Sequence, residues 1–547
     1  MSKLITPLHS IKKKPVNWLY LLWWWIPILI AFCIEISLQK FNSYRLLNLA
    51  ENHFFALVLL SLGFLVKPLR LRKTILALFL SSFVFFVFAE TLYFTWFGTN
   101  FSASSIFVLF ETNVAEASEF IHFYINPFSI TYATFTFLYI LCCWFIHAKQ
   151  KLKVKPILNQ LSIVFLLAFC LVFLRISKLI DQNFPYLVVR GIAVYQDEQA
   201  KLADLAIDEK YGKFTSVKSN ASQPRTFVLV IGESSTKHNF ELYGYPRKNN
   251  PKLRQRKEQL HVFEDVISTN AFTIAALKTA LSLNNFESET ESTLIQLFNQ
   301  AYFETHWISN QRPIGPYESI VTKMSRAAQF YTYTNTETAG QKTPLDEVLL
   351  PHLKTTLKRK TKDKFIVLHL LGTHLQYKDR YPKAFEVFKD NPPNLNFVHK
   401  DAVEKRNQYD NAILYTDYLL DQIIQQVEEQ AGESYVVYFS DHGDEVFLDQ
   451  DFAGHNDDNP TPSMFEVPFL LWMNQDFKND FDGVIDTKRS YSLIDFIHSL
   501  ADLSSIEFEE FKPEKSIFSE DFKMEKRKIK HLYLYSDFKQ NFFHQKP

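Results

Sequence analysis

The chain has 547 residues, enough for two or three domains, and its 59 basic residues balance its 59 acidic ones. This balance excludes a strongly basic or strongly acidic protein overall, and no nucleic-acid partner is expected. The first third of the sequence is nonetheless much more apolar than the rest and is rich in Phe and Trp. The uneven distribution predicts a membrane-embedded part followed by a soluble part.

Five apolar segments predict five membrane-spanning helices within residues 1–181. They are Trp18–Leu38, His53–Val66, Ile75–Phe97, Pro127–His147 and Leu161–Leu179. The second segment is shorter than the ~20 residues that a helix needs to cross the hydrocarbon core. The alternative is the buried helical core of a soluble protein, which is disfavoured because such cores do not supply a series of long apolar segments.

Basic residues flank these segments unevenly and predict their orientation. Lysine and arginine gather before the first span, between the second and third, and between the fourth and fifth, at Lys12–Lys14, Lys67–Lys73 and Lys149–Lys155. These segments should face the cytoplasm by the positive-inside rule. Gly98 to Asn126 has no Lys or Arg and should face the other side. An odd number of spans then places everything after Leu179 outside the cytoplasm, behind a retained N-terminal anchor.

Residues 182–223 are polar and helix-prone, and they predict either an interfacial helix or a solvated linker helix. From residue 224 to 547, apolar strands alternate with amphipathic helices, which predicts an α/β domain with a mostly parallel sheet covered on both faces. Strands are expected near 226–231, 262–267, 302–308, 364–370 and 434–440. Helices are expected near 273–283, 344–358 and 401–428.

Three separated motifs carry the candidate chemistry: Gly232–Ser235, Asn270–Thr273 and Ser440–Glu445. The first and third directly follow apolar strands, so their side chains should meet at the carboxyl edge of the sheet. Together the motifs supply two carboxylates, an imidazole and a hydroxyl, which predict a metal site with its own oxygen nucleophile. These groups belong to Glu233, Asp441, His442 and Thr273.

Thr273 begins an apolar-periodic segment, and a Thr at a helix start commonly serves as an N-cap. The same position suits a phosphate ester, because amide groups and the positive end of the helix dipole point toward it. A Thr hydroxyl attacks phosphorus only when a metal holds it as an alkoxide. The N-cap and the nucleophile are therefore two alternatives for Thr273.

Two histidines follow strands on the expected side of the sheet. His374 comes after the strand near 364–370, and His455 comes shortly after the Asp-His motif. Each can ligate a second ion, hold a phosphoryl oxygen or act as a general acid, and each is otherwise a surface loop residue. His369 lies within a strand and is expected in the core.

Five segments carry a family resemblance: Val228–Ser235, Leu242–Arg247, Trp307–Gln311, His369–His374 and Tyr438–Gly443. They resemble the phosphoethanolamine transferases of Gram-negative inner membranes, above all the branch that decorates heptose in the lipopolysaccharide core. The resemblance runs from the first span nearly to the end, through Tyr491–His498.

This resemblance implies the alkaline phosphatase and sulfatase superfamily fold, five spans, a periplasmic α/β domain and bound zinc. It implies that the metal ligands and nucleophile are Glu233, Thr273, Asp441 and His442. It also implies a substrate role for His374 and for the outer-loop stretch 111–116, which includes Thr112 and Glu116.

Two departures separate the chain from related lipid A enzymes. Those enzymes have an Asn one helical turn before Thr112, where this chain has Val108. They also have a cysteine-rich, disulfide-bonded soluble domain, whereas all four cysteines here lie in predicted spans, at Cys33, Cys142, Cys143 and Cys170. The second departure favours the branch that modifies the core.

The implied reaction is a two-step displacement on phosphatidylethanolamine. A zinc-held Thr273 attacks phosphorus, diacylglycerol leaves, and a core-sugar hydroxyl, on heptose, then takes the group. Glu111 or Glu116 either pairs with the ethanolammonium or belongs to a solvated acidic loop. The basic run Lys526–His531 either contacts lipopolysaccharide phosphates or is a solvated face.

Four other functions remain as alternatives. Two are transfers by the same chemistry, of phosphoethanolamine to lipid A or of phosphoglycerol from phosphatidylglycerol. A plain phosphatase or sulfatase would end with water and would have little use for five spans. A non-catalytic envelope scaffold would not need the carboxylates, imidazole and hydroxyl together.

Overall fold

The computed structural model describes residues 18–38, 43–101, 105–106, 109–110, 112, 114–149, 157–203, 205–219, 223–286, 291–312, 319–335 and 343–545. The chain forms two compact units. The helical unit comprises residues 1–107 and 124–195, and the sheet unit comprises residues 108–123 and 196–547. The predictions for Lys12–Lys14, Val108, Glu111 and Lys151–Lys155 lie outside the described residues.

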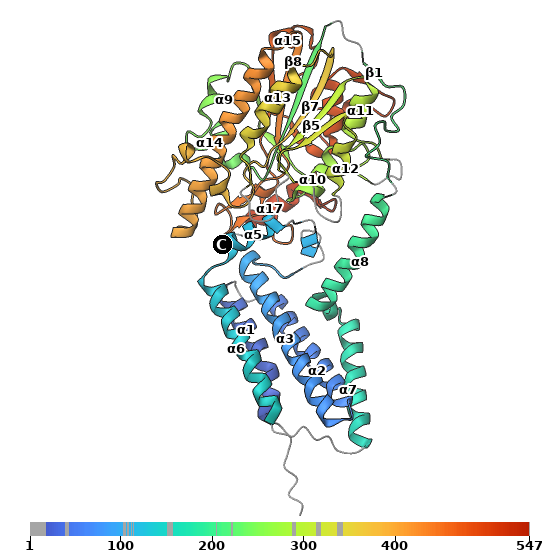
Figure 1. Ribbon diagram of the computed structural model, residues 1–547, viewed down its shortest axis with the longest axis vertical. Helices are drawn as coiled ribbons and strands as arrows, with labels where there is room; N and C mark the ends of the chain where they lie inside the picture. Colours follow the sequence, from blue (N-terminus) through green and yellow to red (C-terminus); the bar gives the residue numbers. More distant parts are fainter. Residues whose placement is uncertain are drawn as a thin grey trace, which may run out of the picture. The chain divides into compact units, whose positions relative to one another are not determined.

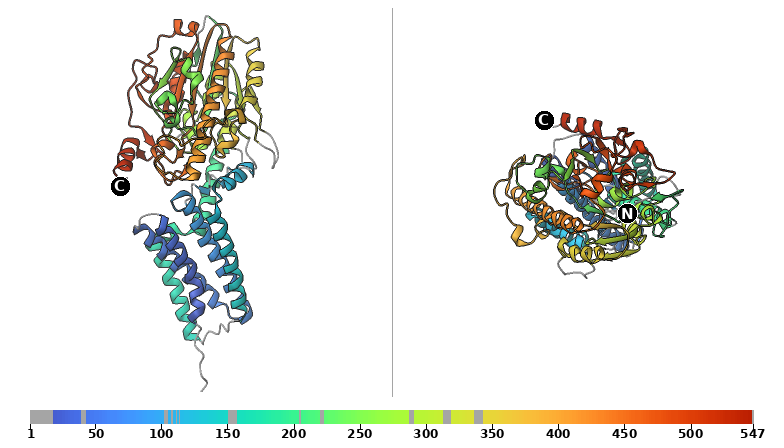
Figure 2. Two further views of the ribbon diagram at one scale, coloured as in Figure 1. Left: turned by 90° about the vertical axis from the view of Figure 1, so that its left-hand side faces the viewer. Right: turned by 90° about the horizontal axis from the view of Figure 1, so that it is seen from above.

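The helical unit is a bundle of apolar helices (Figures 1 and 2). Its helices are α1 (Trp18–Leu38), α2 (Ser43–Leu65), α3 (Leu69–Phe97), α6 (Pro127–Lys149), α7 (Ile157–Ile176) and the greater part of α8 (Phe184–Ala203). Helix α2 contacts α1, α3 and α7, and α3 also contacts α1 and α6. The rings of Trp24 and Phe83 stack across this core at a centroid distance of 5.8 Å.

Three helices in the described part of the chain are long and apolar enough to cross a membrane, over Arg45–Leu65, Leu69–Phe97 and Pro127–Phe145. Shorter apolar helices cover Leu22–Leu38 and Gln160–Ile176. Large apolar side chains on the bundle face outward, and Phe137 and Phe165 are 62% and 75% exposed. An outward-facing apolar surface suits lipid rather than water.

Helix α2 begins ten residues before the segment predicted from hydropathy. The added turns carry polar side chains, but these are buried and hydrogen-bonded inside the bundle. The amide groups of three asparagines donate to three carboxylates, in the pairs Asn48–Glu35 at 3.1 Å, Asn52–Glu90 at 3.2 Å and Asn183–Glu51 at 2.7 Å. Hydropathy alone misses such turns because it scores these side chains as water-exposed.

The sheet unit is built on a seven-stranded sheet in the order β3-β11-β8-β2-β7-β5-β6. The strands are β2 (Arg225–Gly232), β3 (Leu260–Phe263), β5 (Glu304–Ser309), β6 (Phe330–Tyr333), β7 (Asp363–His369), β8 (Glu433–Ser440) and β11 (Phe469–Met473). Neighbours from β8 to β6 pair in parallel, whereas β11 pairs antiparallel with both β8 and β3. Strands β6 and β11 were not among the predicted strands.

Helices cover both faces of this sheet, with α13 and α14 drawn on one side and α11 and α12 on the other (Figure 1). The helices of the unit are α5 (Val114–Tyr124), α9 (Pro251–Gln255), α10 (Thr273–Ala280), α11 (Leu294–Gln300), α12 (Ile320–Arg326), α13 (Leu349–Leu357), α14 (Lys400–Glu428), α15 (Gln475–Asp480), α16 (Phe496–Leu503) and α17 (Tyr535–Gln545). Alternate residues of β2, namely Phe227, Leu229 and Ile231, belong to one core with α10, α11, α12 and α16.

Four pairs of short strands complete the sheet unit. They are β1 (Lys218–Ser219) with β13 (Ile506–Glu507), β4 (Asp265–Ile267) with β12 (Ser490–Ser492), β9 (Glu445–Val446) with β10 (Ala453–Gly454), and β14 (Lys528–Ile529) with β15 (Tyr533–Leu534).

The register of the central strands determines where the loops begin. Gly232 at the end of β2 is opposite Ser440 at the end of β8, and Ile231 is opposite His369 at the end of β7. The three strands are parallel, so the loops that follow them leave the sheet at one edge and one level.

Candidate active site

Two carboxylates are buried at this edge of the sheet. Glu233 directly follows β2 and Asp441 directly follows β8, and neither is more than 1% exposed. The backbone amides of Ser234 and His442 donate to Asp441 Oδ1 at 3.1 and 2.7 Å. Asp441 Oδ2 is buried and has no hydrogen-bond partner in the described structure. The backbone therefore orients the carboxylate through one oxygen and leaves the other for a ligand.

The imidazole of His442 is fully buried beside these carboxylates. Its Nδ1 lies 3.0 Å from the Gly443 carbonyl, which can only accept, so Nδ1 carries a proton and Nε2 faces the two carboxylates. His442 Nε2 lies 3.3 Å from Glu233 Oε1 and 3.6 Å from Asp441 Oδ2, and forms no hydrogen bond with the described residues. A cation is the natural partner of these three groups.

Thr273 is the first residue of α10, and the N-cap is Phe272. No side chain caps this helix end, so the N-cap alternative for Thr273 is wrong. Its hydroxyl instead lies 3.1 Å from both oxygens of Glu233. Thr273 is only half-buried and lines a cavity, so a substrate can approach it from that side.

The charge of this cluster fits a divalent metal. Burial and the neighbouring Glu233 raise the pKa of Asp441 to about 6. Burial lowers the pKa of His442, but the carboxylates of Asp441 and Glu233 outweigh it and raise that pKa to about 10. The ligand atoms of these three residues lie within 4.8 Å of one another. With the Thr273 hydroxyl, the set of two carboxylates, one imidazole and one oxygen fits zinc.

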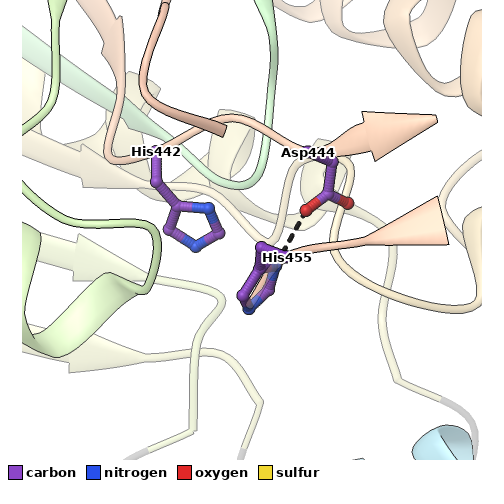
Figure 3. Close-up of side chains that lie close together, drawn as sticks. All are labelled: His442, Asp444 and His455. Atoms are coloured by element: carbon purple, nitrogen blue, oxygen red, sulfur yellow. Dashed lines mark hydrogen bonds and ion pairs between the residues drawn. The ribbon is translucent and has the colours of Figure 1, made fainter. Parts of the chain in front are cut away.

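A second group adjoins the first and consists of His442, Asp444 and His455 (Figure 3). His455 Nδ1 lies 2.7 Å from Asp444 Oδ1, and the Tyr377 hydroxyl donates to Asp444 Oδ2 at 2.8 Å. The rings of His442 and His455 are 4.3 Å apart. Burial raises the pKa of Asp444 to about 7 and lowers that of His455 to about 3. Asp444 thus fixes the orientation of the His455 ring.

A cavity of about 140 Å³ opens in front of Thr273, a volume suited to one small organic group. Six of the predicted site residues line it, namely Thr112, Glu116, Glu233, Thr273, His374 and His455. Asp441 and His442 do not line the cavity and are fully buried. His369, expected in the core, is buried in β7 and also reaches the cavity wall.

The loop that carries His374 packs closely against Glu233. Gly372 has a φ of +53°, and a Cβ at this position would lie 2.8 Å from the backbone N and O of Glu233. Only glycine tolerates both the left-handed backbone and this approach. The amide of Thr373 donates to the Glu233 carbonyl at 3.0 Å. Burial and the Arg380 guanidinium lower the pKa of His374 to about 4, so its ring is neutral.

Two further residues support the site and were not among the predicted site residues. Gln311 Nε2 donates to Glu233 Oε2 at 3.1 Å and to the Leu370 carbonyl at 3.0 Å. Asp346 accepts from the amides of Leu371 and Gly372 at 2.8 and 2.9 Å. Gln311 had two sequence signals: it follows β5 at the same sheet edge, and it ends the segment Trp307–Gln311 that carries the family resemblance. Asp346 had none, because it follows no strand.

Helix α5, which carries Glu116, is held to the sheet unit by Glu119. Arg380 forms an ion pair with the Glu119 carboxylate, and Thr343 Oγ1 donates to the same carboxylate at 3.1 Å. Gln376 Nε2 donates to the Glu119 carbonyl at 2.7 Å. The stretch expected as an outer loop therefore includes a helix, and the acidic Glu119 is an anchor rather than a solvated charge.

Comparison with known proteins gives the class of the sheet unit. The sulfatase family profile matches residues 225–506. The integral membrane protein lipooligosaccharide phosphoethanolamine transferase A (EptA) of Neisseria meningitidis has the same fold, with a TM-score of 0.69 at 20% identity over 92% of this chain and 97% of that one. The chain therefore combines apolar helices with a sulfatase-type domain.

More similar relatives define the family. Phosphoethanolamine transferase EptC of Escherichia coli is 30% identical over 81% of this chain and 82% of its own length. CptA of Salmonella typhimurium is 29% identical over the same shares. The C-terminal periplasmic domain of E. coli EptC, solved in complex with Zn, is 33% identical over 58% of this chain and 93% of that one, with a TM-score of 0.56. This chain belongs to the phosphoethanolamine transferases of the sulfatase family.

Proposed function

We propose that this chain transfers phosphoethanolamine from phosphatidylethanolamine to an inner-core heptose of lipopolysaccharide, through a covalent intermediate on Thr273. The observation that carries the proposal is the Thr273 hydroxyl, 3.1 Å from both Glu233 oxygens and at the wall of a cavity. The names of the relatives from E. coli and S. typhimurium support phosphoethanolamine as the transferred group.

The metal is zinc in this proposal, held by Glu233, Thr273, Asp441 and His442. Bound there, zinc favours the alkoxide form of Thr273 and neutralises charge on the transferring group. Two observations support it: the buried Asp441 Oδ2 and His442 Nε2 both lack hydrogen-bond partners among the described residues, and the E. coli EptC domain was solved with Zn.

In the first half-reaction, Thr273 Oγ1 forms a bond to phosphorus and the bond from phosphorus to the diacylglycerol oxygen breaks. The Thr273 proton passes to the Glu233 carboxylate that it contacts. The diacylglycerol oxygen takes a proton from the hydrogen-bonded Asp444–His455 pair, in which burial raises the pKa of Asp444 to about 7. In the second half-reaction, the heptose hydroxyl bonds to phosphorus and gives its proton back to the Asp444–His455 pair. Thr273 then leaves and recovers its proton from Glu233.

Donor recognition is assigned to the remaining cavity residues. The Glu116 carboxylate pairs with the ethanolammonium, His374 holds a phosphoryl oxygen, and Thr112 lies beside them on the wall. Phosphatidylglycerol has no cation for Glu116 to meet, so it is the weaker donor. Feeding labelled phosphatidylethanolamine or phosphatidylglycerol tests this directly, and efficient transfer from the second lipid would contradict it.

We place five spans in residues 1–181, an interfacial or linker helix in residues 182–223 and the catalytic domain in residues 224–547. The protein is a multi-pass protein of the bacterial inner membrane with this domain in the periplasm. Three apolar helices of spanning length and two shorter ones support the spans. The distribution of lysine and arginine supports the orientation.

The acceptor is tested by mild acid hydrolysis, which separates lipid A from the core sugars before mass analysis. Deletion of the chain should remove a phosphoethanolamine mass from the core fraction. Its loss from the lipid A fraction alone would contradict the heptose assignment and leave the chemistry at Thr273 standing.

A further inference from the structure

A second cavity of about 220 Å³ lies beside the turn that carries Thr273. Thr269 lines this second cavity, whereas Phe272 and Thr273 line the first. Thr269 and Thr273 are four residue steps apart along the chain, so their backbones are at most about 14 Å apart. The walls of the two cavities therefore lie within the length of a few sugar units.

One wall of the second cavity is formed by the segment Lys526–His531. Hydrogen bonds join this segment to the turn that carries Thr273. The Lys530 amide donates to the Thr269 carbonyl at 2.8 Å. Lys530 Nζ donates to the Asp457 carbonyl at 2.6 Å, and the Asp457 carboxylate accepts from the Ala271 amide at 3.1 Å. The basic segment is thus fixed to the element that presents the nucleophile.

The walls carry an excess of positive charge. Lysine and arginine outnumber carboxylates there, with Lys515, Lys523, Lys526, Arg527 and Lys528 against Asp495 and Glu525. Two of the cations are neutralised, because Lys515 pairs with Asp495 at 2.6 Å and Arg527 pairs with Asp265 at 2.8 Å. Within the described residues the other three lysines form no ion pair, and they are free to meet an anion.

The wall of this cavity includes a buried polar group that lacks a hydrogen-bond partner. Ser492 is 5% exposed, and its hydroxyl is buried without a hydrogen-bond partner in the part of the chain that the structure describes. Such a group is costly unless a ligand or water completes it. Hydroxyl groups inside and ammonium groups at the rim suit a ligand that has both sugar hydroxyls and phosphate.

We propose that the second cavity binds a phosphate-bearing saccharide of the acceptor, and so places one of its hydroxyls at Thr273. This proposal rests on the proposed function. The sizes of the two cavities support this assignment. The cavity at Thr273 has room for a headgroup only, so the sugar chain has to bind at another site, and the second cavity is large enough. The lysines bind the acceptor phosphates, and the Ser492 hydroxyl bonds a sugar hydroxyl.

The test uses the full-length protein with two double variants of equal charge change. Lys526→Gln with Lys528→Gln should raise the KM for lipopolysaccharide about tenfold, the loss expected for two exposed charge contacts. Lys358→Gln with Lys360→Gln, which changes two exposed lysines outside the cavity, should leave the KM unchanged. Ser492→Ala should also raise the KM, and its melting temperature shows whether it folds.

A second arm uses lipopolysaccharide whose core phosphates have been removed. This acceptor should show a raised KM with the wild-type protein and no further increase with the cavity variant, since both changes remove one interaction. An equal further increase would contradict the proposal and assign the lysines to another anion, such as the lipid surface.

The same experiments distinguish a failure of the acceptor site from a failure of the proposed function. If the wild-type protein releases no diacylglycerol from phosphatidylethanolamine, the proposed function fails. If release and transfer occur, but the cavity variant has the same KM as the control variant, only the acceptor site is wrong.

Discussion

Arg380 and Glu119 form an ion pair that joins the loop after β7 to helix α5. The Arg380 guanidinium also donates to the carbonyls of His374 at 3.2 Å and Leu375 at 2.8 Å. One side chain therefore links the loop that carries His374 to the helix that carries Glu116. The side chains of the pair are 2% and 20% exposed, so solvent screens it little.

Glu119→Gln should therefore weaken donor binding. The substitution leaves the Arg380 charge without its carboxylate and loosens the helix that brings Glu116 to the cavity. We expect the KM for phosphatidylethanolamine to rise about tenfold, with a smaller change in kcat. Glu404→Gln, on the exposed face of α14, is the control. Equal KM values for the two variants would show that Glu119 does not position α5 for the donor.

Asp444→Asn should slow transfer about 100-fold, because the carboxylate that orients His455 at 2.7 Å is lost. Tyr377→Phe removes only the hydrogen bond to the other Asp444 oxygen and should cost less. Single-turnover rates and zinc content are measured on both. If Asp444→Asn loses zinc in proportion to activity, Asp444 is a metal ligand and the orienting role is wrong.

Stringent chelation should abolish activity, and added zinc should restore it. Asp441→Asn and His442→Ala should each lower the bound zinc, because each removes a ligand atom from the buried cluster. Calcium should not substitute, since it usually requires six or more oxygen ligands. Metal content is measured by mass spectrometry on protein purified without chelator. Full activity without a bound transition metal would exclude the metal role.

Glu304 gives a pH-dependent contribution to stability remote from the cluster. Burial raises its pKa, but hydrogen bonds from Arg359, His306 and Thr361 outweigh burial and lower it to about 2. Arg359 Nε donates to Glu304 at 2.6 Å. Because the folded pKa lies below the unfolded value of about 4.3, the stabilisation is complete above that pH and is lost as the pH falls toward 2.

Glu304→Gln should accordingly lower the melting temperature of the detergent-solubilised chain at pH 7. Since the pair is partly exposed, solvent screening limits its contribution to about 1 kcal/mol. The difference from wild type should shrink as the pH falls from about 4.5 to about 2.5. Glu520→Gln, at an exposed position, is the control. A difference that is constant with pH would contradict the electrostatic origin.

The position of the site at the carboxyl edge of the sheet could be predicted from the sequence, because apolar strands and the carboxylates that follow them are both local patterns. The segments 227–231 of β2 and 435–439 of β8 are apolar, and Glu233 and Asp441 come directly after the two strands. Parallel neighbours then bring the two carboxylates to one level. Strand β11 is just as apolar, but its antiparallel place between β8 and β3 depends on pairings that no local pattern reports.

The parts that sequence reasoning missed depend on distant partners. The Glu119–Arg380 contact joins positions 261 apart, and the charge of Glu119 alone fits a solvated loop equally well. The first turns of α2 look too polar for a bundle until Glu35 and Glu90 are seen to satisfy its asparagines.

Peptide mass spectrometry of protein incubated with phosphatidylethanolamine and no acceptor tests the covalent step at Thr273 most directly. We expect a phosphoethanolamine adduct on the peptide that contains Thr273, and on that residue when the peptide is fragmented. Thr273→Ala should form no adduct and no product while keeping its fold. An adduct on Ser234, Ser235 or Ser268 in the wild-type protein, or transfer by Thr273→Ala at the wild-type rate, would contradict it.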